Sequence, residues 1–367
     1  MENGSSEDRA RDTGSSRSEY YGTHIGPTTE FEPILLDLAA LNGSMTPNDS
    51  YRKADARTAF FSDRGTNTEA TTGVNSIASR TLERLVGAHS TSLLRRYLTA
   101  IHPNFPIVQQ EVFSEYKGGK ANGADPTLLA AIYALAIPLL LQEKSRIVSP
   151  FPDINHVEGL ALRLFGDSIC NPTLSTVQAG LLLMQRPNID SKTLNTQLVA
   201  IAHELGLHLD CSSWSLSPAE KGLRKRLAWA LYMQDKWCAL VHGRPSTIFP
   251  NNWAVQALFD EDFDVSDGIS DTAVSVEELD RGRALMKQMV SLTEILSTVL
   301  DTFFTLQAMQ EVDDAGPSGT RLILERAKPV QIRLKEWFAK LPLDLKMDNT
   351  MTGKPSSTGK NSSSIAV

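Results

Sequence analysis

Residues 198–250 carry the pattern that decides the fold, and they read LVAIAHELGLHLDCSSWSLSPAEKGLRKRLAWALYMQDKWCALVHGRPSTIFP. The stretch predicts a helix, a tight connection and a long second helix. Apolar residues recur on one face of the first helix with three- and four-residue spacing: Leu194, Leu198, Ile201 and Leu205. Gly206 follows the last of them and suits the left-handed position at which many helices end.

The second helix is predicted to begin at Ser217, because serine can cap a helix, Pro218 fits its first position and Glu220 can reach back to the amide of the cap. Two apolar faces follow, one with Leu223, Leu227, Leu231 and Trp237, the other with Trp229, Met233 and Leu240. A helix that is apolar on two sides is usually buried between neighbours. Gly243 and Pro245 are expected to end it.

Hydrophobic periodicity predicts helices along most of the remaining chain and no strands, since no run alternates with period two. The expected helices are residues 82–86, 91–101, 108–116, 126–141, 151–169, 173–184, 276–310 and 321–338. Asp125 and Ser175 are the expected caps of the helices that follow them. The predicted class is all-α, a multi-helix array that forms one large helical domain with disordered termini.

The chain divides by composition into three parts. Residues 1–78 are mostly polar and are expected to be disordered, with a docking element at 20–41 that combines a turn-rich loop with a short apolar stretch. We favour docking of this element onto the helical domain over docking onto a partner. Residues 79–345 form the helical domain, and the polar residues 346–367 are an expected disordered tail.

Composition and charge argue against several classes of protein. The net charge of the 367 residues is -7, which argues against a strongly basic nucleic-acid-binding surface. Cys170, Cys211 and Cys238 lie far apart, so they give no disulfide framework and no metal quartet, and they favour a reducing compartment. No secretory signal opens the sequence. The most apolar segment, residues 128–141, is too short to span a membrane and is predicted to be a core helix.

Local motifs for chemistry are weak. His203 and His208 are five residues apart with Gly206 between them, whereas a zinc protease motif needs histidines four apart on one helix face. The ring of His208 is expected to bond a nearby backbone or carboxylate group instead. The basic group at 221–226 is interpreted as a solvated helix face, and the acidic run at 260–271 as a solvated loop without the pattern of a calcium loop.

Asp235 and Arg244 suggest one specific contact. Asp235 lies among apolar residues of the long helix, and a buried carboxylate needs a partner. A guanidinium that binds with two nitrogens is the strongest one available. We therefore expect Arg244 to pair with Asp235 or, alternatively, to bind carbonyl groups at a helix end. In either case the role is structural.

An ordered set of motifs resembles a known family. The set comprises Tyr97, His102-Pro103 and Phe105-Pro106-Ile107, then Gly206-Leu207-His208, Ser217-Pro218 with Glu220, Arg224-Lys225-Arg226-Leu227, Trp229, Leu231-Tyr232, Asp235-Lys236 and Gly243-Arg244-Pro245. Its order and spacing resemble the fungal-specific transcription factor regulatory domain, the middle homology region of zinc-cluster regulators. The resemblance covers roughly residues 82–341.

The resemblance implies a nuclear regulator of RNA polymerase II transcription. Its expected partners are other transcription regulators or coactivators, a small-molecule effector and a second copy of the chain in a homodimer. Members bind DNA through an N-terminal six-cysteine cluster that holds two zinc ions. The resemblance implies no catalytic, cofactor-binding or metal-binding residue in this chain, and it assigns structural roles to the matching positions His102, Pro103, Phe105, Pro106, Gly206, His208, Trp229, Asp235, Arg244 and Pro245.

The sequence departs from the family in three places. No six-cysteine cluster precedes the domain, so zinc is expected only in a missing N-terminal cluster, and DNA contact only indirectly or through a missing N-terminal domain. The family's paired tryptophans appear as Ala228-Trp229, and the family's further helices are replaced by polar sequence from Met347. A fragment, an incomplete gene model and a regulator without its own DNA contacts remain as alternatives. A helical enzyme or ligand-binding protein with no recognisable catalytic set is the second function class.

Overall fold

The computed structural model describes residues 22–26, 28–29, 51–55, 58–61, 68–109, 124–142, 151–263 and 274–346. Helices dominate these residues, which confirms the all-α class. The α-helices are α2 (Thr68–Val86), α3 (Ser90–Ala100), α5 (Pro126–Gln142), α6 (Ile154–Ser168), α7 (Leu174–Leu183), α8 (Ser191–Glu204), α9 (Pro218–His242), α10 (Val276–Phe303), α11 (Leu306–Asp314) and α12 (Gly319–Lys340). Short 3-10 turns lie at Gly87–His89, Pro250–Asn252, Asp260–Asp262 (η4), Gly316–Ser318 and Leu343–Leu345.

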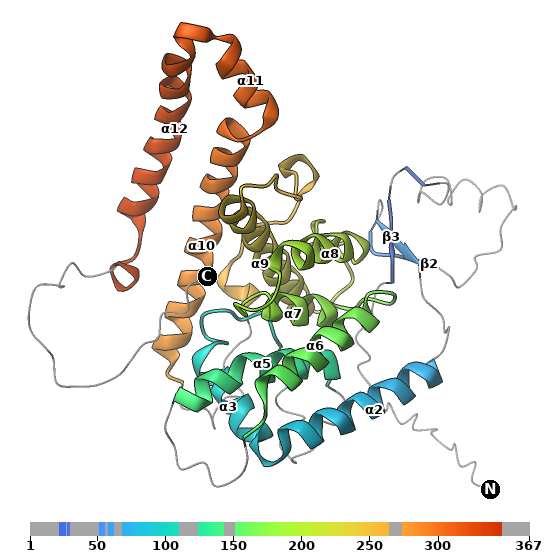
Figure 1. The fold of residues 1–367 in the computed structure, drawn as a ribbon. Coiled ribbons are helices and arrows are strands. Elements are labelled where there is room, and N and C mark those ends of the chain that lie inside the picture. The colour runs from blue at the N-terminus through green and yellow to red at the C-terminus, as the bar shows by residue number, and fades with distance from the viewer. Residues whose placement is uncertain are drawn as a thin grey trace, which may run out of the picture.

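Helix α5 is the centre of one half of the array. Helices α2, α3, α6 and α7 pack around it, as the lower part of Figure 1 shows. Every residue from Pro126 to Ile137 is buried, because the sequence of α5 is apolar on all sides. Asp125 caps α5 by accepting the amide hydrogens of Thr127 and Leu128, as predicted.

Helix α9 is the centre of the other half and packs against α7, α8 and α10. Both of its predicted apolar faces are buried over most of their length, although Leu240 near its end is exposed. Ser217 accepts the amide hydrogen of Glu220 at 3.2 Å, which confirms the cap. Gly206 and Gly243 have φ angles of 67° and 60°, so the predicted left-handed helix ends are confirmed as well.

Two helix predictions were wrong in detail. The cap of α7 is Thr173, which forms a capping box with Thr176, and Ser175 lies inside the helix. The single helix expected at 276–310 is two helices, because the chain breaks at Phe304 and Thr305 caps α11. The hydroxyl of Thr305 accepts the amide hydrogen of Ala308, three residues later. This local hydrogen bond competes with continuation of α10 through Thr305.

A small antiparallel sheet corrects the prediction that the chain has no strands. It orders β1 (His24–Ile25), β3 (Ala59–Phe61) and β2 (Tyr51–Lys53), with His24 opposite Phe60. Strands of two or three residues are too short to give a period-two signal. All three lie within residues 1–78, which were expected to be mostly disordered, and α2 begins before the expected start of the helical domain at residue 79.

The sheet places part of the predicted docking element against the helices. Ile25 and Phe60 are buried, and the Phe60 ring packs on Trp214 with centroids 5.3 Å apart. The apolar half of that element, the expected helix at 108–116 beyond residue 109, and the expected disordered ends at 1–18 and 347–367 lie outside the described residues.

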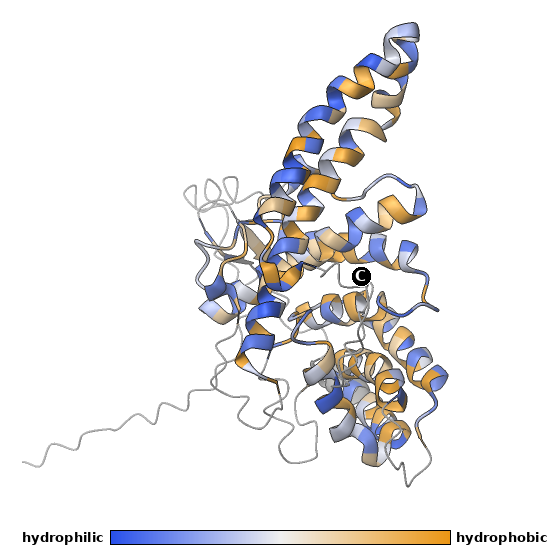
Figure 2. Ribbon diagram, turned by 90° about the vertical axis from the view of Figure 1, so that its left-hand side faces the viewer, coloured by the Kyte–Doolittle hydropathy of each residue, from blue (hydrophilic) through white to orange (hydrophobic). Residues whose placement is uncertain are grey.

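The C-terminal helices form a hairpin that projects from the body. Helix α10 packs on α9, α11 continues away from the body after a bend of 49°, and α12 folds back along both, as Figures 1 and 2 show. Among the described residues, no single helix is both long and apolar enough to cross a membrane. Helices α10 and α11 meet that criterion only when taken together across a bend of 49°.

Candidate functional site

Asp235 and Lys236 form a buried charged centre near the C-terminal end of α9. Their exposed fractions are 1% and 0%. The carboxylate of Asp235 accepts hydrogen bonds from Asn195 Nδ2 at 3.0 Å, from the Ser246 hydroxyl and from the backbone amides of Thr247 and Ile248 at 3.0 and 3.1 Å. Asp235 therefore joins α8, α9 and the loop that follows α9.

Lys236 completes this centre. Its ammonium group donates to the carbonyl oxygen of Ile248 at 2.6 Å and to the Ser246 hydroxyl, and it lies 4.0 Å from the Asp235 carboxylate. Burial lowers the pKa of Lys236, while the Asp235 charge opposes that shift. The Ser246 hydroxyl bridges the two charges, and the loop at 246–248 is held by both.

Arg244 does not pair with Asp235, so that prediction was wrong. The positions around the carboxylate are filled by Ser246 and by the two loop amides that follow it. Arg244 is exposed, and within the described part of the chain its guanidinium makes no hydrogen bond or ion pair. The alternative also fails for the side chain, because it is the backbone amide of Arg244 that bonds the Ala239 carbonyl at 3.1 Å.

A cleft of 250 Å³ lies between the start of α8 and the end of α9, with Asp235 in its wall. Lys192, His242 and Arg244 line it, as do the three threonines Thr193, Thr196 and Thr247. Basic groups and hydroxyls around an open cleft are suited to a carboxylate or phosphate group. Among the sequence-predicted residues, the fold brings Asp235, Arg244 and Pro245 together here.

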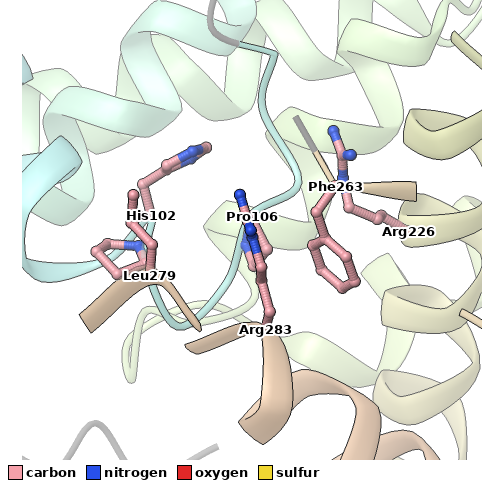
Figure 3. A pocket seen from close by; sticks show the side chains of 7 residues that line it. His102, Pro106, Arg226, Phe263, Leu279 and Arg283 are labelled. Carbon is pink, nitrogen blue, oxygen red and sulfur yellow. The ribbon is translucent and has the colours of Figure 1, made fainter. Parts of the chain in front are cut away.

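A second and much smaller pocket is lined by part of the segment 102–107, which we call the first motif. Figure 3 shows its lining, which comprises His102, Pro103, Pro106, Arg226, Phe263, Leu279 and Arg283. Its volume of 20 Å³ is room for about one water molecule. Burial, with help from the Arg226 charge, lowers the pKa of His102 to about 4. A neutral buried histidine beside two arginines indicates a packing role for this pocket.

The segment 102–106 supports α10 through its backbone. A Cβ atom at Gly282 of α10 would lie 1.7 Å from the carbonyl oxygen of Pro103, so only glycine allows this approach. Phe105 is partly buried against the main core. The first motif therefore fixes how α10 crosses the body of the domain.

The basic group at 221–226 is not a solvated face. Arg224 and Arg226 are buried, and Arg224 donates to the Leu205 carbonyl at 3.0 Å while its guanidinium lies over the Trp214 ring. Arg226 donates to the Asp262 carbonyl, and Lys225 pairs with the Asp262 carboxylate at 2.8 Å. These contacts attach η4 to α9, so part of the acidic run is bound and not solvated.

Three histidines gather where β1 meets the end of α8. The ring centroid of His208 lies 4.8 Å from that of His203 and 5.4 Å from that of His24. The expected hydrogen bond of the His208 ring is not formed at Nδ1, which has no partner. Burial is the largest cause that lowers the pKa of His208 to about 3, and the two neighbouring histidines add to it. No group of three metal-binding side chains with suitable geometry occurs among the described residues.

The remaining motif residues have packing roles. Trp229 donates its indole N–H to the Gln256 carbonyl at 2.9 Å, and Gly206 lies against the Phe60 ring. The sequence interpretation missed Asn195 and Ser246, which hold Asp235. Ser246 directly follows Gly243-Arg244-Pro245, so its position beside a capped helix end was the available signal.

Comparisons with known proteins agree with this architecture. A family model described as "Fungal specific transcription factor domain" matches residues 94–339. Transcriptional activator protein DAL81 of Saccharomyces cerevisiae is 32% identical over 302 residues, which cover 72% of this chain and 31% of the yeast protein. Cutinase transcription factor 1 beta of Fusarium vanettenii is 27% identical over 192 residues, 46% of this chain and 22% of that protein.

The Acetamidase regulatory protein of Aspergillus fumigatus is 26% identical over 184 residues, 47% of this chain and 23% of that protein. The chain thus spans at most about a third of the length of these relatives. No solved structure matches it.

The charged centre generates a first prediction. Asp235→Ala leaves Lys236 buried without its counter-charge, and breaking a buried pair in this way costs about 3–5 kcal/mol. Arg244→Ala removes an exposed side chain that has no polar partner in the part of the chain that the structure describes, and it should change stability by less than about 0.5 kcal/mol. Urea denaturation followed by far-UV circular dichroism measures both. Equal losses in the two variants would contradict the arrangement described.

The histidine cluster generates a second prediction. His208 is neutral in the folded chain, so the unfolded chain binds more protons below the ordinary histidine pKa. The contribution of His208 to the free energy of unfolding is complete above about pH 6.5. It is lost as the pH falls, and the loss reaches about 2 kcal/mol at pH 5. His208→Gln should therefore reduce the difference in unfolding free energy between about pH 7.5 and about pH 5 by that amount. The exposed His156, changed to Gln, is the control, and an equal effect there would refute the assignment.

Proposed function

The chain belongs to the fungal specific transcription factor family, and we propose that it regulates transcription by RNA polymerase II as the regulatory domain of a zinc-cluster-type factor. The family match over residues 94–339 carries this proposal. The printed names of the relatives support it, since they describe a transcriptional activator, a transcription factor and a regulatory protein.

The proposed place of action is the nucleus. The domain acts there by binding other transcription regulators or coactivators and has no catalytic role. Zinc and direct DNA contact belong, in this proposal, to a six-cysteine cluster, a motif that residues 1–367 do not contain. Promoter contact is then made either through a partner protein or through such a cluster outside residues 1–367.

The cleft between α8 and α9 is the proposed effector site. Lys192 and Arg244 supply positive charge at the cleft, and Thr193, Thr196 and Thr247 supply hydroxyl groups. This chemistry fits a small anionic metabolite with carboxylate or phosphate groups. An effector bound here would contact α8, α9 and the loop at 246–248 that Asp235 and Lys236 hold. Its binding would therefore stabilise the packing of these three elements against one another.

Transcriptional regulation is tested with a reporter. Residues 1–367 are fused to a heterologous DNA-binding domain and expressed in a fungal reporter strain. We expect a several-fold change in reporter output relative to the DNA-binding domain alone, and we expect Asp235→Ala to abolish it by unfolding the domain. Unchanged output from a fusion that is present in the nucleus and bound at the reporter promoter would contradict the proposal.

The effector site is tested with citrate and inorganic phosphate as probes. We expect each to raise the thermal midpoint of the chain, because a ligand that binds only the folded state stabilises it. Arg244→Glu should abolish the shift for both probes. Arg163→Glu, an exposed arginine on α6, is the matched control and should keep it. Loss of the shift in both variants, or in neither, would overturn the site while leaving the reporter result intact.

A further inference from the structure

Helix α12 exposes large apolar side chains that the hairpin does not use. It packs on α10 and α11, and Figures 1 and 2 show it standing away from the rest of the domain. Leu324 and Phe338 are 64% and 59% exposed, and Ile323, Ile332 and Leu334 are also exposed. A contiguous apolar surface of this kind marks an interaction site more often than chance.

Four of these five exposed residues lie toward one side of the helix, and Ile332 lies away from them. Ile323, Leu334 and Phe338 follow a spacing of eleven and four residues, which places them along one side of an α-helix, and Leu324 adjoins them. The side that faces α10 adjoins this one: Arg333 bonds Thr298 at 2.9 Å, and Trp337, about 40° around the helix from Ile323, bonds the Gln288 carbonyl at 3.3 Å. We call Ile323, Leu324, Leu334 and Phe338 the α12 stripe.

Positive charge borders the α12 stripe. Helix α12 has six basic and two acidic side chains, a net charge of +4 in a chain whose total is -7. Arg321 and Arg326 are engaged with Glu325 and Glu311. Lys328 and Lys335, which follow Leu324 by four and eleven residues and so lie on its side of the helix, are exposed and form no ion pair within the described residues.

We propose that the α12 stripe binds an acidic amphipathic helix of a partner protein. Apolar anchors at helical spacing recognise the apolar face of a partner helix. The two free lysines select for acidic residues on its flank. From Ile323 to Phe338 the stripe is about 22 Å long, which matches a partner helix of about four turns.

Charge decides between this occupant and a second copy of the chain. Two α12 helices that met through the same stripe would bring two net charges of +4 together, and like charges at an interface oppose association. Nucleic acid would satisfy the lysines but leave the apolar side chains without a partner. An acidic amphipathic helix satisfies both.

Binding is measured with synthetic helical peptides of about 18 residues, long enough to cover the stripe. One peptide carries leucine at helical spacing with glutamate elsewhere, and the other carries lysine in place of glutamate. Fluorescence anisotropy with the full chain should give saturable binding of the acidic peptide and much weaker binding of the basic one. Equal binding of the two peptides, or no binding, would overturn the proposal.

Variants locate the site. Leu334→Glu and Phe338→Glu should each weaken binding of the acidic peptide about tenfold, which is the effect of losing one anchor residue. Leu162→Glu is the matched control, because Leu162 is a similarly exposed leucine that lies on α6 and not on α12. Lys328→Glu with Lys335→Glu should reverse the preference toward the basic peptide. A loss as large in Leu162→Glu would refute the stripe.

Two further measurements test the competing occupants. Sedimentation equilibrium should show that Leu334→Glu does not reduce any self-association of the chain. Flotation with vesicles of phosphatidylserine and phosphatidylcholine should show that the same variant does not reduce any binding of the chain to the vesicles. A positive result in either would assign the α12 stripe to a second copy or to a membrane surface and would overturn the proposal, whatever the reporter fusion shows about transcription.

Discussion

The buried contact between Asp235, Lys236 and Ser246 is the constraint on which the second half of the domain depends. Two charges without exposure are costly to desolvate, and their attraction offsets that cost only when the remaining hydrogen bonds are made. Here the amides of Thr247 and Ile248 and the carbonyl of Ile248 make them. The chain that leaves α9 is thereby turned back along the helix, and Ile248 enters the core.

The consequences of that turn extend to α10. The segment after Ile248 returns along α9, where its Gln256 carbonyl accepts the Trp229 indole and η4 meets Lys225 and Arg226. This segment and the first motif together line the small pocket of Figure 3, against which α10 lies. Motifs that lie far apart in the sequence thus meet at one place, the pocket on which α10 packs.

Sequence patterns predicted the helices well because burial repeats along α5 and α9 over several turns. They failed where structure depends on single contacts. The strands at His24 and Ala59 are too short to show a period, and Thr173 and Ser175 are equally plausible caps by residue type. At the candidate site, Asp235 was correctly identified as a buried carboxylate, but its partner could not be chosen, because donors from the loop compete with a guanidinium by geometry alone.

The difference between Asp235 and Arg244 bears on how the family motif should be interpreted. The two residues are nine positions apart and both line the cleft, yet Asp235 is buried with its partners supplied, whereas Arg244 is exposed and has no polar partner among the described residues. A stability requirement accounts for Asp235, Lys236 and Ser246. It does not account for Arg244, whose side chain contributes charge to the cleft and no hydrogen bond to the fold. In the proposed effector site, that charge is available to a bound anion.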